Sequence, residues 1–206
     1  AGAGLSSAIY LEVDVAPEER RREAEWITKL CAEPTNPLRG AVIGAPIVDG
    51  SVAEFEEWVT EWAANPYMKG VRQVLHIHPS GTCLRDDIVS KARCCGEKGV
   101  VFELCMRCDE LTDVATLAAK VPNTRLVVDH IGGHHQLSGA PADKRDAWRN
   151  GLQQLASCRN VWVKLSGMMG AQGGNGNSGA SDWQDAQAES VRFCLGTIPT
   201  DRMLFG

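Results

Sequence analysis

The chain has 206 residues, of which 44% are hydrophobic and 23% are charged. This composition is typical of a folded globular domain and excludes a disordered or collagen-like chain. The net charge of −5 and the lack of a basic stripe argue against nucleic acid or an anionic membrane surface as a partner. No hydrophobic run approaches the roughly 20 residues that a membrane-spanning helix needs.

Short hydrophobic runs alternate with helical patterns along the chain. The runs are rich in Val, Ile and Leu, as is typical of strands buried on both faces. They predict seven strands, over residues 8–14, 40–47, 71–77, 100–107, 125–131, 161–166 and 202–205.

Helical patterns fill the intervals between these runs. Pro17 and the two glutamates after it predict the start of a first helix, since Pro fits the first turn and acids suit its positive end. Ser51 and Glu54 have the spacing of a capping box for a second helix, and Pro66 marks its end. Further helices are predicted over 84–98, 111–120 and 141–158, and from about Ser181 onward.

Strands that alternate with helices predict βαβ units and a parallel α/β sheet. An open doubly wound sheet and a (β/α)₈ TIM barrel both fit this pattern. The open sheet usually carries a Gly-rich nucleotide-binding turn, and no G-x-G-x-x-G or Walker sequence follows any predicted strand. The Gly-rich tract 170–179 reads as a flexible loop after a strand, which is where the active-site loops of barrels lie.

Four charged residues stand inside otherwise hydrophobic strands: Glu12, Arg72, Glu103 and Lys164. An unpaired buried charge is costly, so these side chains need partners. A closed barrel gives two acids and two bases a common interior, whereas an open sheet does not. We therefore predict a (β/α)₈ barrel with an ion-paired interior, of which this chain holds seven strands. For the two acids and Arg72, a role in specifying the fold alone is the favoured alternative.

The C-terminal ends of the strands are the places where barrel active sites form. Four residues stand there: His76, Arg107, His130 and Ser166. His130 is the sharpest candidate, because a hydrophobic strand ends in an acid and this imidazole. It could bind a metal or transfer a proton, or be a structural, hydrogen-bonded histidine.

Three weaker motifs contain histidine or cysteine pairs that could bind a metal or take part in redox chemistry. His76 and His78 have the H-x-H spacing of metal ligands, but Pro79 predicts that His78 leaves the strand. His134 and His135 are most simply a solvated loop pair. The C-x-x-C of Cys105 and Cys108 lies at a strand end without a second such pair, so redox or zinc roles are disfavoured.

The chain contains eight cysteines. An even count in a small secreted protein would indicate disulfides, but this chain is large enough to fold without them. Most of the cysteines stand in hydrophobic runs. We expect buried free thiols in a reducing compartment, either the cytoplasm or an organelle interior.

Four motifs in order along the chain resemble the amidohydrolase-related TIM-barrel hydrolases, most closely the sugar-lactone hydrolase branch. They are GVRQVLH at 70–76, VDHIG at 128–132, VWVKLSG at 161–167 and DRMLFG at 201–206. The resemblance runs from Tyr10 to Gly206. It implies that residues 1–206 form one barrel domain, truncated at both ends.

The resemblance also implies a divalent metal, zinc or a similar ion, that lowers the pKa of a bound water. The family usually supplies an H-x-H from its first strand, a His at the position of His130 and an Asp after its eighth strand. Only His130 stands in this chain, so the first strand is expected before Ala1 and the Asp after Gly206. Arg107 and Cys108 occupy the region where some members place another His.

The expected function is metal-dependent hydrolysis of a lactone or similar cyclic ester, with a small molecule as substrate. His130 would be a catalytic and metal-binding residue, and Arg107 would bind a substrate oxygen. His76, Ser166 and Lys164 would line the substrate pocket. Two alternatives stay open: a non-oxidative decarboxylase, and an inactive barrel that serves as a structural or interaction subunit of a larger assembly. A homo-oligomer or a larger protein assembly is the expected protein partner.

Overall fold

The computed structural model describes residues 6–137, 140–167 and 180–206. Within them, seven parallel strands form one sheet whose spatial order follows the order along the chain. All seven predicted strands are present within a few residues of their predicted ranges. They are β1 (Ala8–Leu11), β2 (Leu38–Gly44), β3 (Met68–Val74), β4 (Val101–Cys105), β5 (Leu126–Val128), β6 (Val161–Leu165) and β7 (Met203–Phe205).

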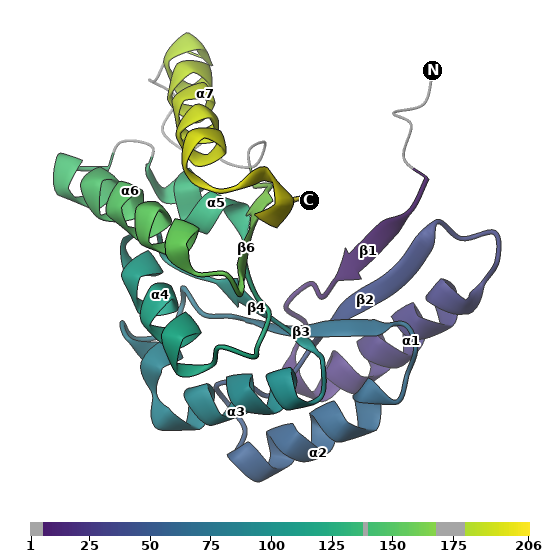
Figure 1. The fold of residues 1–206 in the computed structure, drawn as a ribbon. Helices are drawn as coiled ribbons and strands as arrows, with labels where there is room; N and C mark the ends of the chain where they lie inside the picture. The colour runs from purple at the N-terminus through teal and green to yellow at the C-terminus, as the bar shows by residue number, and fades with distance from the viewer. Residues whose placement is uncertain (1–5, 138–139, 168–179) are drawn as a thin grey trace.

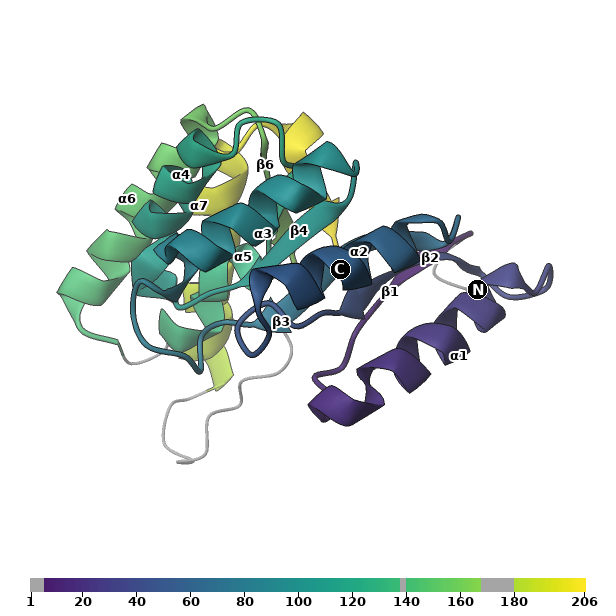
Figure 2. The ribbon, with the colours of Figure 1, turned by 90° about the horizontal axis from the view of Figure 1, so that it is seen from below.

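Helices connect the strands and cover the outer face of the sheet (Figures 1 and 2). The longer ones are α1 (Arg20–Ala32), α2 (Val52–Ala63), α3 (Asp86–Glu97), α4 (Leu111–Lys120), α6 (Ala142–Ser157) and α7 (Ala180–Thr197). Short turns are α5 (His130–Gly133), η1 (Pro17–Glu19), η2 (Thr82–Leu84), η3 (Cys108–Glu110), η4 (His134–Leu137) and η5 (Thr200–Arg202). None of the described helices has the length and hydrophobicity needed to cross a bilayer.

The sheet curls into a half-barrel, and β1 and β7 are its two edge strands (Figure 1). A doubly wound sheet reverses its strand order at a switch point, whereas this sheet keeps one direction from β1 to β7. The architecture is therefore that of seven strands of a TIM-like barrel, as the buried charges predicted.

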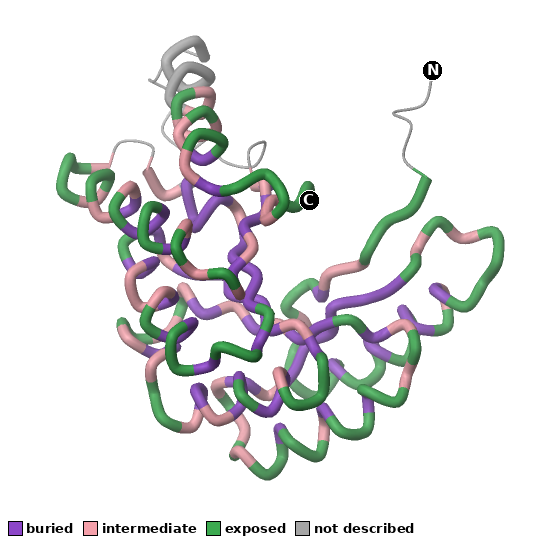
Figure 3. Tube along the Cα trace, viewed as in Figure 1, coloured by how far each residue is buried: buried purple, intermediate pink, exposed green. Residues whose placement is uncertain are grey.

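The hydrophobic core lies between the outer face of the sheet and the helices. Successive side chains of a strand point to opposite faces, so every second residue enters this core. Figure 3 shows the buried residues concentrated along the strands and on the facing sides of the helices. The strands contribute Val71, Phe102, Leu104, Val128 and Val163, and the helices contribute Ile27, Phe55, Val59, Leu117 and Leu152.

The second helix begins as its sequence predicted. The Ser51 hydroxyl accepts a hydrogen bond from the Glu54 backbone N–H at 3.2 Å, and the Glu54 carboxylate accepts one from the Ser51 N–H at 2.7 Å. This reciprocal capping box satisfies two backbone donors that the first turn leaves unpaired.

Candidate active site

Four buried charged side chains and the nearly buried Arg72 form a continuous ion-pair network on the inner face of the sheet. Arg72 Nε lies 2.6 Å from Glu12 Oε1, and Arg72 Nη1 lies 2.9 Å from Asp129 Oδ2. Lys164 Nζ lies 3.0 Å from Asp129 Oδ1 and 2.6 Å from Glu103 Oε2. The predicted pairing of the four strand charges is confirmed, and Asp129 joins the two halves of the network.

The network contains three carboxylates but only two cations, so one negative charge is in excess. Burial and the neighbouring Asp129 carboxylate raise the pKa of Glu103 to about 7, although Lys164 opposes this shift. Burial alone would lower the pKa of Arg72, but the carboxylates of Asp129 and Glu12 outweigh it and raise that pKa. Protonation of Glu103 therefore removes the excess negative charge of the network as the pH falls below about 7.

His130 is placed by a sharp turn in the backbone directly after β5. The predicted strand 125–131 ends at Val128, and His130 and Ile131 adopt φ values of 55° and 50°. Non-glycine residues rarely adopt this left-handed conformation, and such strain is common at functional sites. The turn brings the imidazole to the end of β6, where His130 Nδ1 lies 2.9 Å from Ser166 Oγ.

The Ser166–Gly167 segment fits closely around this imidazole. Gly167 has φ of 71°, and a Cβ on it would lie 2.8 Å from the His130 ring. Only glycine fits both the conformation and the space, and this explains why glycine follows Leu165 and Ser166 in the VWVKLSG motif. Burial lowers the pKa of His130, although Asp129 opposes this, so the ring is neutral at neutral pH.

Three potential metal donors meet beside this turn. The thiol of Cys105, at the end of β4, lies with a carboxylate oxygen of Asp129 and a ring nitrogen of His130, all within 4.8 Å of one another. Nitrogen, oxygen and sulfur donors together suit a zinc-type ion, so the residues fit part of the metal site that the fold implies. No other group of three such donors occurs among the described residues.

Cys105 and Asp129 are the two site residues that sequence reasoning missed. The sequence pattern indicates Cys105 only as half of a C-x-x-C and Asp129 only as the acid before His130. The alternation of side chains along a strand could have indicated both residues. Cys105 lies two residues after Glu103 on the same face of β4, and Asp129 lies two residues after Val127 on the inner face.

His76 and Arg107 occupy the loops beyond β3 and β4. His76 Nδ1 lies 3.4 Å from Cys105 Sγ, so this ring lies at the edge of the donor group. Arg107 donates hydrogen bonds to the carbonyl oxygens of His76 at 2.9 Å and His78 at 2.8 Å, and to the Glu110 carboxylate at 2.6 Å. Arg107 thus holds the loop that carries His76.

The five predicted site residues consequently fall into two groups. His130, Ser166, His76 and Lys164 surround the Asp129–Cys105 corner of the half-barrel, whereas Arg107 contacts the loop behind His76. His78 lies in the turn after β3 and is not part of the donor group. The Gly-rich tract 170–179 lies outside the described residues.

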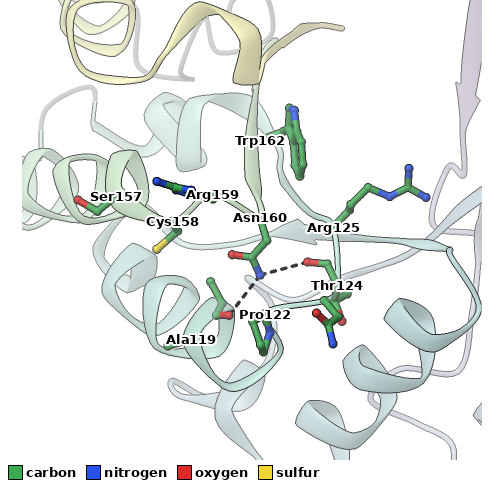
Figure 4. Close-up of a pocket in the computed structure, with 11 residues that line it drawn as sticks. Ala119, Pro122, Thr124, Arg125, Ser157, Cys158, Arg159, Asn160 and Trp162 are labelled. Atoms are coloured by element: carbon green, nitrogen blue, oxygen red, sulfur yellow. Dashed lines mark hydrogen bonds between the residues drawn. The ribbon is translucent and has the colours of Figure 1, made fainter.

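A groove of about 620 Å³ lies at the opposite end of the sheet, between the turns that precede β5 and β6 (Figure 4). The Asn160 side-chain amide crosses its floor and donates to the carbonyl oxygens of Ala118, Val121 and Thr124, at 3.0 to 3.2 Å. Barrel active sites lie at the C-terminal strand ends, so this groove is separate from the donor group.

The cysteines are all free, and all but Cys158 are buried. This confirms the expectation of buried free thiols. Cys105 ends β4 and Cys108 lies beyond it, and no disulfide joins them.

Comparison with known proteins places the chain in a family. The family model described as "Amidohydrolase" matches residues 6–206. The chain spans 66% of a curated relative that it matches at 23% identity, and 64% to 68% of the first solved structures that it matches.

Three solved structures show the same fold, and each aligns with 98% of this chain. An amidohydrolase from Burkholderia multivorans with bound zinc matches at 20% identity and a TM-score of 0.75, over 67% of its chain. A probable 2-pyrone-4,6-dicarboxylic acid hydrolase from Acinetobacter baumannii matches at 14% and 0.69, over 67%. A 5-carboxyvanillate decarboxylase from Novosphingobium aromaticivorans, complexed with manganese, matches at 14% and 0.58, over 66%.

Proposed function

The chain belongs to the amidohydrolase family, and from that premise we propose that it forms the body of a metal-dependent hydrolase that acts on a lactone or similar cyclic ester. The observation that carries this proposal is the donor group of Cys105, Asp129 and His130 at the C-terminal ends of two neighbouring strands. A zinc-containing amidohydrolase and a probable hydrolase of a cyclic pyrone ester among the structural neighbours support the same class.

His130 is the proposed catalytic and metal-binding residue. Burial keeps its imidazole neutral, which is the form that binds a metal or accepts a proton. The hydrogen bond to Ser166 fixes the orientation of the ring. A bound divalent ion would supply a water of lowered pKa and would polarise the ester carbonyl.

The remaining predicted residues are assigned to the substrate. His76 and Ser166 would line the pocket, and Lys164 would present its ammonium group from beside Asp129. Arg107 would bind an anionic or carbonyl oxygen with its planar guanidinium group, while its other donors hold the His76 loop.

A non-oxidative decarboxylase is the second candidate. The specific observation in its favour is the shared fold of the manganese-containing 5-carboxyvanillate decarboxylase. The same cations, Arg107 and Lys164, would then hold a carboxylate that leaves as carbon dioxide. Carbon dioxide release without lactone hydrolysis would select this candidate over the first.

The test is replacement of His130 by Ala in the full-length protein, with His78→Ala as the matched control outside the donor group. We expect H130A to reduce lactone hydrolysis by roughly 10²-fold or more, because proton transfer by a positioned side chain typically contributes that much. H78A should retain activity. Unchanged turnover in a folded H130A protein would refute the assignment, and absence of both activities in the wild type would favour an inactive barrel with a structural role.

A further inference from the structure

Cys105 stands apart from the other seven cysteines by its surroundings. Among the described residues it is the one thiol that forms a group with a carboxylate and an imidazole in which all the donor atoms lie within 4.8 Å of one another. Its backbone carbonyl accepts hydrogen bonds from the Leu75 and His76 N–H groups at 3.1 and 3.0 Å, which fixes the end of β4 against the loop after β3. The backbone that carries the Cys105 side chain is therefore held in place by the loop after β3.

Asp129 is the least available of the three donors. One of its oxygens lies 2.9 Å from Arg72 and the other lies 3.0 Å from Lys164. A metal that took this carboxylate as its main ligand would compete with two buried cations. The sulfur of Cys105 and the ring of His130 can bind a metal without breaking either ion pair.

His130 and Cys105 are each supported by a neighbouring polar group. Ser166 Oγ lies 2.9 Å from His130 Nδ1 and holds the orientation of the ring. His76 Nδ1 lies 3.4 Å from Cys105 Sγ. Metal-binding residues typically have such hydrogen-bond partners, which orient them and tune their basicity.

We infer that Cys105 is a thiolate ligand of the metal centre, together with His130, and that the centre therefore selects a thiophilic ion of the zinc class over manganese or magnesium. This inference rests on the proposed metal dependence but names a ligand that the family pattern does not include. Thiolate sulfur favours zinc, cobalt and cadmium, whereas manganese and magnesium prefer oxygen.

The proton balance of this step is simple. Binding breaks the S–H bond of Cys105 and forms a sulfur–metal bond, and the proton leaves to bulk solvent. Metal affinity should accordingly rise with pH, because one proton is released for each ion bound.

The experiment uses Co²⁺ as a spectroscopic probe of the full-length protein after removal of its metal by a chelator. A thiolate ligand gives an intense sulfur-to-cobalt charge-transfer band in the near ultraviolet, and the d–d bands report cobalt binding independently. We expect wild type to show both. Cys105→Ser should lose the charge-transfer band and weaken Zn²⁺ binding by more than the roughly 10- to 100-fold that loss of an outer partner costs.

Cys83→Ser is the matched control, since Cys83 is also fully buried and outside the donor group, and burial raises its pKa to about 12 as it does that of Cys105. C83S should keep both bands. Wild type with d–d bands but no charge-transfer band would overturn the thiolate ligand and leave the proposed function intact. This outcome is measured on the wild type alone, so it does not depend on whether a variant folds. Wild type that binds no Co²⁺ at all would overturn both.

Discussion

Glu103 is the residue at which the excess negative charge of the inner face has a measurable consequence. Its carboxylate faces Lys164 directly and lies in the same network as Glu12, Arg72 and Asp129. Its pKa is about 7 in the folded chain against an ordinary value of 4.5. Between those pH values the folded chain holds a proton that the unfolded chain releases, so this group makes the free energy of unfolding fall as pH rises.

We predict that Glu103→Gln removes this decline. The stabilising contribution of the Glu103 proton is complete below about pH 4.5 and is lost as pH rises through 7. The stability of E103Q relative to wild type should therefore increase between those pH values, by an amount on the order of 3 kcal/mol. Denaturant unfolding at a series of pH values measures it. Parallel pH profiles for wild type and E103Q would contradict the prediction, and the exposed Glu61→Gln serves as the control.

At the same scale, the sequence predicted which residue types would meet but not every partner. An imidazole at the end of a hydrophobic strand identified His130, because few such residues occur in buried runs. Asp129 stands inside the predicted strand 125–131, next to His130, and nothing in that position indicates that it is the centre of the network. Its two ion pairs come from Arg72 and Lys164, which lie on β3 and β6, and no local pattern predicts that meeting.

At the scale of elements, α2 depends on the capping box at its start. Ser51→Ala removes the side-chain acceptor of the Glu54 N–H, and we expect a loss of about 1 kcal/mol in the free energy of unfolding. Thr60→Ala, on the exposed part of the same helix, should change stability by no more than about 0.5 kcal/mol. Thermal or urea unfolding of both variants checks this. Equal effects of the two substitutions would show that the cap contributes nothing.

Within the described residues the predicted strands are correct in number and order, but every predicted strand except 202–205 extends beyond the observed C-terminal end. The interpretation of 125–131 and 100–107 as strands followed hydrophobicity alone. The ladder ends at Val128 and Cys105, after which the backbone turns to present His130 and Arg107. Hydrophobicity does not report φ, so the left-handed turn at His130 and Ile131 could not be predicted from the pattern.

At the scale of the whole molecule, Arg72 on β3 connects the residues that follow β1 to those that follow β5. It joins Glu12, beyond β1, to Asp129, beyond β5, and all three side chains are buried or nearly so. Arg72→Met leaves two acids without their main cation. We expect it to lower the free energy of unfolding by about 3–5 kcal/mol, the usual cost of removing one partner of a buried ion pair.

Arg21→Met is the matched control for this prediction. Arg21 makes two short hydrogen bonds to Glu61, but both side chains are half exposed. Solvent screens such a pair, so its loss should cost no more than about 1 kcal/mol. Chemical denaturation of both variants gives the comparison. Similar losses for R72M and R21M would mean that the inner network does not stabilise the fold.

The fold class was predictable because burial of charge is a global constraint. Acids and bases in four separate hydrophobic strands need a shared interior, and only a curled sheet supplies one. The ion pairs among Glu12, Arg72, Glu103 and Lys164, through Asp129, bear this out. Which charge pairs with which depends on the stagger between strands, and the sequence carries no direct signal for that.

The consecutive strand order also bears on how the chain assembles during synthesis. Each strand pairs with the one made just before it, so the sheet can grow one βα unit at a time from the N-terminus. Arg72 with Glu12 forms a neutral pair after β3, but β4 and the end of β5 then add two acids, Glu103 and Asp129. The compensating cation, Lys164, is 61 residues beyond Glu103. A nascent sheet that stops short of β6 therefore carries two surplus negative charges inside, so it must keep water or protons there until the sixth strand arrives.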